Sequence, residues 1–408
     1  MRILVFGHRL ETGGSQTNTI DLAAAARDLH GHEVWVFATP GPAAELVARR
    51  GLELIPAPEP SRFHPAWPTV RALDLAVRRV RPDLLHVWEW PQVLDAYYGA
   101  HLWRDVPMLA TNMTMDPLRS IPPELPLTVG TQAIVDASRS RRSGPVWLIE
   151  PPFDVDADDP SRVDPEPFTT EHGVRDDGLP LVVTVSRIVE DMKLEGIRDA
   201  IRATELLDVR CPVRLAIVGG GAAFDEVAAS AAAVNGRLGR SAVVTTGPLQ
   251  DPRPAYAAAD VMLGMGSSAI RGLAFGKPTV VLGEQGFSEI FDATTQDGFF
   301  RAGYYGIGPG SSNGSGAGRL ADLIERLVTD SEVRSRAAAT RQLMVERYGL
   351  PAVAGRLDRA YGEAARPSGR GATLANALRH LPATFVTQLP EGQKDRLRHL
   401  LPRGAGRS

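Results

Sequence analysis

The stretch "GMGSSAIRGLAFGKPTVVLGEQGFSEIF", residues 264–291, predicts a short helix followed by a strand. Its part "SAIRGLAFG" has the length and apolar spacing of a helix, and "PTVVLG" is a short β-branched run typical of a buried strand. Gly264 and Gly266 stand where the chain turns into the helix. One residue stands out, because Arg271 is a cation in an otherwise small and apolar helix.

The same alternation of strand and helix extends in both directions from this stretch. Predicted strands in the first part of the chain are "RILVFG", "HEVWVFA", "DLLHVW", "PMLAT" and "LTVG". Those in the second part are "LVVTVS", "VRLAIVG", "AVVTTG", "DVMLGM" and "PTVVLG". Strands that alternate with helices predict parallel sheets covered by helices on both faces.

Residues 151–178 are crowded with proline, aspartate and glycine, which predicts a linker between the two series. We therefore expect an α/β protein with two Rossmann-like domains that face each other across a cleft. The expected boundaries are 1–165, 166–350 and a C-terminal helix with a basic tail at 351–408. In such proteins a ligand binds at the carboxyl ends of the strands.

Composition narrows the class of protein. The 408 residues are 43% hydrophobic and 23% charged, as in a soluble globular protein. A net charge of −3 argues against nucleic acid as a partner. The only cysteine, Cys211, excludes an internal disulfide, and no window approaches the roughly 20 apolar residues of a membrane span. We expect a cytoplasmic location.

The last part of the chain, from Arg366, is basic and is interrupted by proline and glycine. It has two interpretations. One is a pair of surface helices with a frayed end. The other is a weak peripheral contact with an acidic membrane surface through the arginines and leucines of "DRLRHLL", residues 395–401.

Two loops carry candidate binding residues. Gly13 and Gly14 follow the first strand, where they let the backbone approach a ligand; the alternative is that they only form the turn. Arg187 and Lys193 follow a strand of the second series, where two cations suit a nucleotide diphosphate; the alternative is a solvated charged turn. A nicotinamide cofactor is disfavoured, because "GGGAAF" ends in Phe224 where the dinucleotide motif needs glycine.

These motifs, in this order, resemble those of retaining GT-B glycosyltransferases of family 4. The similarity covers most of residues 1–360: "GGSQTNTIDLAAAARDLHGHEVWVFA", "RPDLLHVW", "SRIVEDMK", "RLAIVGGG", "TGPLQDPRPAYAAADVML" and "LAFGKPTVVLGEQGFSEIF". The resemblance implies transfer of a sugar from a nucleotide-sugar donor, most simply a UDP- or GDP-sugar. It implies no metal and no further cofactor.

The resemblance also implies roles for individual residues. Arg187 and Lys193 would grip the pyrophosphate, and Glu289 would lie near the sugar-binding loop, although it also suits a helix start. These three form the implied catalytic set. The implied donor-binding residues are Gly13, Gly14, Gly247, Leu249, Gly266, Ser267, Ser268 and Arg271.

The sequence departs from the family at positions that face the ligand. Arg271 stands where the family has the second glutamate of a Glu-x7-Glu pair, and the first would fall at Leu263. An expected histidine is replaced by Asn112 or Met113, and another by Trp88. A guanidinium only donates hydrogen bonds, so it cannot accept one from a ribose hydroxyl.

Three accounts of Arg271 stay open. An active enzyme can use it for a phosphate or a sugar carboxylate, a non-catalytic homologue can partner an active transferase, or Arg271 can pair with a neighbouring acid. On the acceptor side, Glu89, Asn112 and Asp116 are candidates, with Glu89 and Asp116 as substitutes for the missing histidine. We expect a retaining glycosyltransferase with an unidentified acceptor; the alternatives are a binding partner of a transferase and an epimerase or phosphorylase of the same fold.

Overall fold

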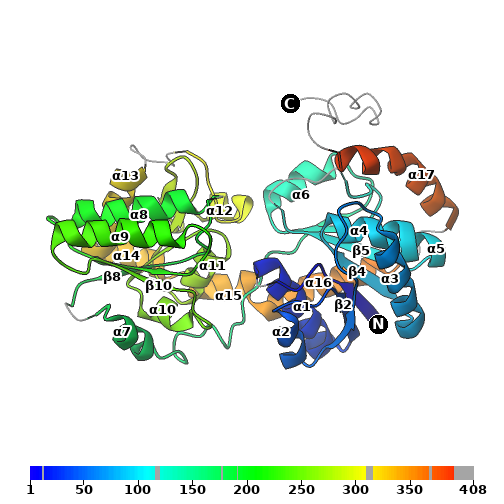
Figure 1. Cartoon of the computed structure of the whole chain (residues 1–408), viewed down its shortest axis with the longest axis horizontal. Helices are drawn as coiled ribbons and strands as arrows, with labels where there is room; N and C mark the ends of the chain where they lie inside the picture. Colours follow the sequence, from blue (N-terminus) through cyan, green and yellow to red (C-terminus); the bar gives the residue numbers. More distant parts are fainter. Residues whose placement is uncertain are drawn as a thin grey trace. The chain divides into compact units, whose positions relative to one another are not determined.

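A computed structural model describes residues 1–11, 13–114, 120–175, 178–190, 192–308, 316–366 and 370–389. The chain forms two compact units. The first comprises Met1–Pro152 and Leu350–Ser408, and the second comprises Phe153–Gly349. Each unit is an α/β domain with its own sheet, as expected (Figure 1).

The first unit is built on a seven-stranded parallel sheet in the order β3-β2-β1-β4-β5-β6-β7. Its strands are β1 (Arg2–Phe6), β2 (Glu33–Ala38), β3 (Glu53–Pro56), β4 (Leu84–Trp88), β5 (Met108–Asn112), β6 (Leu127–Val129) and β7 (Val146–Leu148). The strand order reverses direction between β1 and β4. Ligands of doubly wound sheets bind beside this kind of switch point.

Helices cover both faces of this sheet. They are α1 (Gly14–His30), α2 (Ala44–Arg49), α3 (Trp67–Val80), α4 (Trp90–Ala96), the π-helical η1 (Tyr97–His101), α5 (Leu102–Arg104), α6 (Gln132–Arg139), α16 (Leu350–Ala364) and α17 (Arg370–Thr387). Side chains alternate along β1, so Leu4 and Phe6 join the core under α3 and α4, whereas Ile3 and Val5 join the core under α1 and α16.

The segment after residue 350 is part of the first unit. Helix α16 packs beside α1 and buries Leu357 and Tyr361 in the sheet core. The Tyr361 hydroxyl lies 2.8 Å from Nδ1 of His86 on β4, and Nε2 of His86 lies 2.6 Å from the Thr111 hydroxyl. The expected separate segment 351–408 therefore belongs, in its described part, to the N-terminal domain. The stretch 395–401 lies outside the described residues.

The second unit has a six-stranded sheet in the order β10-β9-β8-β11-β12-β13, parallel except for β13. Its strands are β8 (Leu181–Val185), β9 (Arg214–Val218), β10 (Val243–Gly247), β11 (Val261–Gly264), β12 (Thr279–Leu282) and β13 (Ser288–Ile290). Here the switch point lies between β8 and β11.

The second sheet is also covered on both faces. Its helices are α7 (Glu166–His172), α8 (Leu194–Leu207), α9 (Phe224–Leu238), α10 (Arg253–Ala258), α11 (Ser267–Ala274), α12 (Gln296–Ala302), α13 (Gly316–Thr329), α14 (Ser331–Ala338) and α15 (Arg341–Tyr348). Figure 1 shows α8 and α9 together on one face, away from α7 and α10. Val182 faces the α8–α9 core, and its neighbours Leu181 and Val183 face the α7–α10 core.

The predicted linker 151–178 is more ordered than its composition suggests. It contains α7, whose Phe168 is buried against α10. Residues before α7 also pack on the second unit, because Asp158 pairs with Arg271 and the Asp158 carbonyl accepts a hydrogen bond from Arg341. The expected boundary at residue 165 therefore falls inside this unit. No helix in the described part of the chain has the length and apolar character to cross a membrane.

Candidate functional site

Both switch points carry the polar residues that the sequence singles out. In the first unit, β1 leads into the loop with Gly13 and Gly14, and β4 ends at Glu89. In the second unit, β8 leads into the loop with Arg187 and Lys193, and β11 leads into Gly266 at the start of α11. The carboxyl ends of neighbouring parallel strands meet at one edge, so each unit presents one candidate binding edge.

A chain of hydrogen bonds crosses the switch point of the first unit. Gln16 Nε2 lies 3.1 Å from His8 Nδ1, His8 Nε2 lies 3.2 Å from Ser15 Oγ, and Ser15 Oγ lies 3.1 Å from Glu89 Oε1. His8 follows β1, Ser15 and Gln16 lie in the first turn of α1, and Glu89 follows β4. Three separate segments thus converge on the Glu89 carboxylate.

Gln16 fixes which groups donate and which accept along this chain of hydrogen bonds. Gln16 Nε2 also points at the carbonyl of Arg9, which only a donor can do, so His8 Nδ1 accepts and the neutral ring carries its proton on Nε2. Burial lowers the pKa of His8, against the opposing effect of the Arg9 carbonyl. Ser15 donates to Glu89 rather than to His8. This order differs from a hydrolytic triad, in which histidine receives the serine proton.

Glu89 has two properties of a functional residue. Its backbone lies at φ 66° and ψ 150°, a region almost reserved for glycine, which costs about 1–3 kcal/mol. Burial raises the pKa of its carboxyl, although hydrogen bonds from Ser15 and the Met113 amide oppose this rise. A half-buried acid of raised pKa on a strained backbone suits proton transfer or hydroxyl binding.

The other predicted residues of this edge differ in accessibility. Gly14 has open space around it, and a side chain at Gly13 would meet only the flexible Gln16. Asn112 ends β5 but is 1% exposed; its Nδ2 donates to Thr114 Oγ1, and its Oδ1 has no partner among the described residues. Asp116 lies outside the described residues.

The loop after β8 presents two cations at the switch point of the second unit. Arg187 is exposed, and its guanidinium has no hydrogen-bond or ion-pair partner in the described ranges. Lys193 is half-buried and stands directly before the first residue of α8. The loop is held close to β9, because Gly219 and Gly221 approach the carbonyls of Ser186 and Ile188 where a Cβ would not fit. Both cations are therefore placed at the binding edge.

The turn after β11 presents the start of α11. Gly266 adopts φ 59° and precedes the helix, so the amides of Ser267 and Ser268 come before the first intrahelical bond, from Ile270 to Gly266. Ser267 is exposed. The Ser268 hydroxyl instead closes the turn, because it lies 3.0 Å from the amide and 3.1 Å from the carbonyl of Met265. Ser267 and the helix amides thus suit an anion better than the Ser268 hydroxyl.

The loop after β12 contains an arrangement that the sequence does not reveal. Gln285 and Gly286 both have positive φ, at 56° and 76°, and both amides donate to the carboxylate of Glu195, at 3.0 and 2.6 Å. Consecutive amides in such a conformation form a concave anion site. Glu195, two residues after Lys193, occupies this site.

Arg271 points to a buried acid. Its Nε lies 3.0 Å from Oδ2 of Asp158, whose side chain is 3% exposed. Burial raises the pKa of Asp158, and Arg271 partly opposes this effect. Pairing with an acid, the third account above, is thus observed, and it is compatible with either of the other two. Asp158 lies in the predicted linker, far from Arg271 in the sequence, so the pattern of residues around Arg271 could not indicate this pair.

The remaining predicted residues occupy different surroundings. Gly247 ends β10 at φ 75°, and Leu249 is half-buried against the α7–α10 core. Glu289 lies on the antiparallel strand β13 and not at a helix start, so that alternative was wrong. Its Oε2 pairs at 3.0 Å with Arg319 of α13, whose side chain is 1% exposed.

The switch points bring together most, but not all, of the predicted residues. They gather Gly13, Gly14 and Glu89 in one unit, and Arg187, Lys193, Gly266 and Ser267 in the other. Gly247 and Leu249 lie two strands from β8. Sequence reasoning missed His8, Ser15 and Glu195. Of these, His8 left a signal, since it is a polar residue directly after a predicted strand.

Two models of glycosyltransferase families match consecutive parts of the chain. Glycosyltransferase Family 4 matches residues 12–158, and Glycosyl transferases group 1 matches residues 179–330. Two Rossmann-like domains in this order define the GT-B fold, and the matches support a glycosyltransferase similar to family 4. A search of curated proteins finds no match.

Solved structures show the same fold. HepE from Anabaena, in complex with UDP, is 16% identical at a TM-score of 0.67, with 89% of this chain and 100% of HepE covered. A glycosyltransferase from Rickettsia africae is 15% identical at 0.69, covering 90% and 99%. Sucrose-phosphate synthase from Thermosynechococcus elongatus is 17% identical at 0.60, covering 88% and 98%.

Proposed function

We propose that this protein transfers a sugar from a nucleotide-sugar donor to a hydroxyl acceptor, with retention at the anomeric carbon and without a metal ion. The supporting observation is the pair of loops at the β8–β11 switch point, which offer Arg187, Lys193 and the amides that start α11. Cations and helix-start amides are the groups that hold a diphosphate. HepE, of the same fold, was solved with UDP, which favours a UDP-sugar over a GDP-sugar.

In this mechanism the second unit holds the leaving group. Arg187 and Lys193 bind the pyrophosphate and neutralise the charge that grows as the sugar–phosphate bond breaks. The amides at Ser267 and Ser268 bind the distal phosphate. The backbone near Gly247 and Leu249 reads the base, and Glu289, oriented by Arg319, lies at the loop that carries the sugar.

The first unit handles the acceptor. Gly13 and Gly14 allow close approach of the donor, and Glu89 binds the attacking hydroxyl, with Asn112 and Asp116 as further acceptor-side residues. The acceptor attacks the anomeric carbon on the face from which the phosphate leaves, so the configuration is retained. The leaving phosphate lies on that same face and takes the acceptor proton. Glu89 orients that hydroxyl and does not need to be the final proton acceptor.

A second candidate is a non-catalytic partner of an active transferase. It is favoured by one observation: the Arg271–Asp158 pair occupies the place where the family resemblance expects a ribose-binding glutamate. A protein of this kind would keep the fold but would not bind the donor.

A thermal-shift panel with UDP, GDP, ADP, TDP and CMP separates these candidates. A donor-binding enzyme should gain about 2.7 kcal/mol with the correct nucleotide at 100 times its dissociation constant. Arg187→Ala should reduce this gain, while Arg198→Ala, in the surface pair with Glu226, should leave it unchanged. If no nucleotide or nucleotide sugar stabilises the protein, the enzyme proposal is wrong and the binding-partner role gains support.

A further inference from the structure

Three neighbouring elements of the first unit, α3, α5 and α17, expose large apolar side chains. Together with the loop before α3 they carry seven of the exposed large hydrophobics among the described residues: Phe63, Trp67, Leu75, Trp103, Leu374, Leu378 and Phe385. Single exposed apolar residues are ordinary, but a concentration of this kind marks an interaction surface. None of these residues belongs to the binding edges described above.

A tryptophan pair lies on this surface. Trp67 begins α3 and is 60% exposed, and Trp103 on α5 is 43% exposed. Their ring centroids are 5.7 Å apart at an angle of 61°. Arg71 follows Trp67 by one helical turn and is also exposed. Tryptophan and arginine side by side are typical of the interface between water and a lipid bilayer, where an amphipathic ring and a cation both find partners.

Helix α17 is fixed to the unit by its other face. The Tyr98 hydroxyl lies 3.0 Å from the Thr384 hydroxyl. Just after the helix, Gln388 Oε1 accepts a hydrogen bond from the His64 backbone amide, and Gln388 Nε2 donates one to the His64 carbonyl, at 2.6 Å each. In the described part of the chain, Leu374, Leu378 and Phe385 are each more than half exposed. The helix sequence contains two arginines and no carboxylate, so the helix carries a net positive charge.

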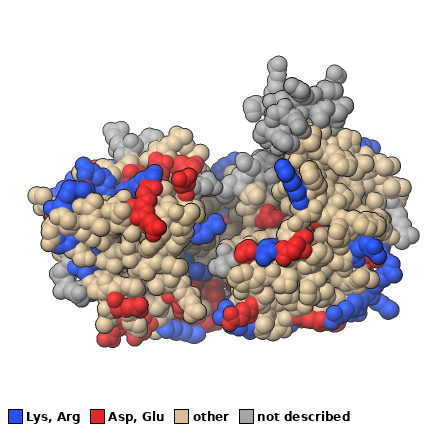
Figure 2. Space-filling model, viewed as in Figure 1, with Lys and Arg blue, Asp and Glu red and all other residues tan. Residues whose placement is uncertain are grey.

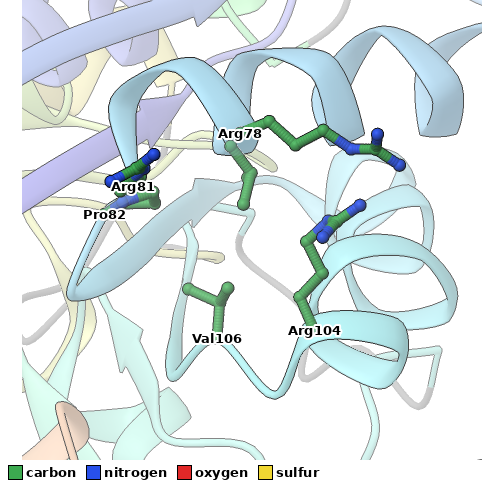
Figure 3. Close-up of a pocket in the computed structure, with 6 residues that line it drawn as sticks. Arg78, Arg81, Pro82, Arg104 and Val106 are labelled. Atoms are coloured by element: carbon green, nitrogen blue, oxygen red, sulfur yellow. The ribbon is translucent and has the colours of Figure 1, made fainter.

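A basic pocket opens beside the exposed tryptophans. It has a volume of about 380 Å³ and is lined by Val77, Arg78, Arg81, Pro82, Arg104 and Val106 (Figure 3). Arg78 and Arg104 both pair with Asp74, and Arg81 has no partner in the described part of the chain. Three arginines thus line this hollow, two of them paired with Asp74, and Figure 2 shows basic side chains gathered where α3 lies. An excess of cations around a hollow suits a phosphate group.

We propose that the surface formed by α3, α5, α17 and this pocket docks the first unit onto a membrane that contains anionic phospholipids. The tryptophans and the exposed apolar side chains of α17 would lie among the headgroups, and the Arg78–Arg81–Arg104 pocket would take a lipid phosphate. This goes beyond the proposed function, because it does not depend on sugar transfer.

Charge selects this occupant over two others. A second copy of the chain would bring the same arginines against one another, which repels. The chain's own segment 390–408 is also basic, with Lys394, Arg396, Arg398, Arg403 and Arg407 against Glu391 and Asp395. Anionic lipid offers the opposite sign over a wide area and a hydrocarbon layer for the apolar side chains.

The test is co-sedimentation of the full-length protein with two kinds of vesicle. One kind is phosphatidylcholine alone, and the other is phosphatidylcholine mixed with phosphatidylglycerol. The protein should bind the mixed vesicles several-fold more strongly, and added salt should weaken this binding because it screens the arginines.

Matched variants locate the contact. Arg71→Gln/Arg81→Gln should lower the partition coefficient by roughly tenfold or more, since each arginine near an anionic surface contributes about 1 kcal/mol. The control Arg326→Gln/Arg334→Gln removes two exposed arginines from the second unit and should change it by less than about twofold. Trp67→Ser/Trp103→Ser should also weaken binding, in contrast to the exposed pair Leu206→Ser/Val209→Ser of the second unit. Circular dichroism confirms that each variant is folded.

Several outcomes overturn the proposal. Equal binding to both vesicles, or no binding to either, contradicts it. Loss of binding only in Arg396→Gln/Arg398→Gln/Arg403→Gln would assign the contact to the C-terminal segment. Light scattering that shows a dimer, dissociated by Trp67→Ser/Trp103→Ser without any vesicle binding, would assign the surface to self-association.

Discussion

Arg271 and Asp158 form an ion pair of 3.0 Å across 113 residues of sequence. The aspartate side chain is 3% exposed and the arginine side chain 37% exposed, so the acid is buried and the base reaches solvent. The helix position that the family resemblance assigns to a hydrogen-bond acceptor is therefore held by a donor whose direction is set by a buried partner. A ribose hydroxyl at this place would meet the guanidinium, which only donates hydrogen bonds, so the hydroxyl oxygen would have to be the acceptor.

The two ends of this pair should differ in their contribution to stability. Arg271→Ala leaves a buried carboxylate with less compensation and should cost about 1–3 kcal/mol in the free energy of unfolding. Asp158→Ala leaves an arginine that water can solvate, so it should cost less. Urea unfolding of both variants and of the double variant gives the comparison. A larger cost for Asp158→Ala than for Arg271→Ala would contradict this asymmetry.

The loop cations should matter for turnover and not for folding. Arg187→Ala and Lys193→Ala should each raise the activation barrier by roughly 2–4 kcal/mol, comparable to the loss of one oxyanion donor. The measurement is the initial rate of nucleotide release from the donor that best stabilises the protein. Arg198→Ala is the matched control, because Arg198 lies on α8 and pairs with Glu226 at the surface. A variant Arg187→Ala that turns over as fast as the parent would remove Arg187 from the site.

Glu89 should reduce stability at neutral pH. Its pKa is raised in the folded state, so between the unfolded and folded pKa values the folded protein binds more protons, and stability falls as pH rises through that interval. Glu89→Gln keeps an acceptor for Ser15 but cannot ionise. The variant should therefore gain stability relative to the parent as pH rises from 4 to 8, while transfer slows by about 10²-fold or more.

The control for this prediction separates strain from charge. Glu89→Gly removes the carboxyl and also suits the backbone at φ 66°, so it should be more stable than Glu89→Gln at every pH. Urea unfolding across the pH range tests both variants. If the parent and Glu89→Gln keep parallel stability curves, the raised pKa is absent.

His86 should contribute a separate loss of stability in acid. Burial lowers its pKa to about 3 from 6.5, so below pH 6.5 the unfolded chain takes up a proton that the folded protein excludes. Stability should fall by up to about 1.4 kcal/mol per pH unit as pH drops from 6.5 toward 3. His86→Gln, which retains polar atoms for Tyr361 and Thr111, should flatten this slope. An unchanged slope in thermal unfolding between pH 6.5 and 4 would show that His86 is protonated in the fold.

Much of the fold is encoded locally and was therefore predictable. Buried parallel strands read as short apolar runs, and the loops after β8 and β11 stand out because glycine and cations interrupt those runs. Trp88, which stands where the resemblance expects a histidine, is fully buried in the core. Long-range pairs were not predictable. Asp158 with Arg271 and Glu289 with Arg319 each join segments with no shared periodicity, and the His8–Ser15–Glu89 chain exists only because β1 and β4 are neighbours.

The placement of α16 has a consequence for biosynthesis. The N-terminal domain includes α16, residues 350–364, and the Tyr361 hydroxyl is a partner that His86 lacks until this helix is made. During translation, residues 153–349 are therefore all synthesised before the N-terminal domain has α16 and α17. A chain that stops short of residue 350 would contain every described strand of both sheets and would still expose the part of the first sheet's core that α16 covers.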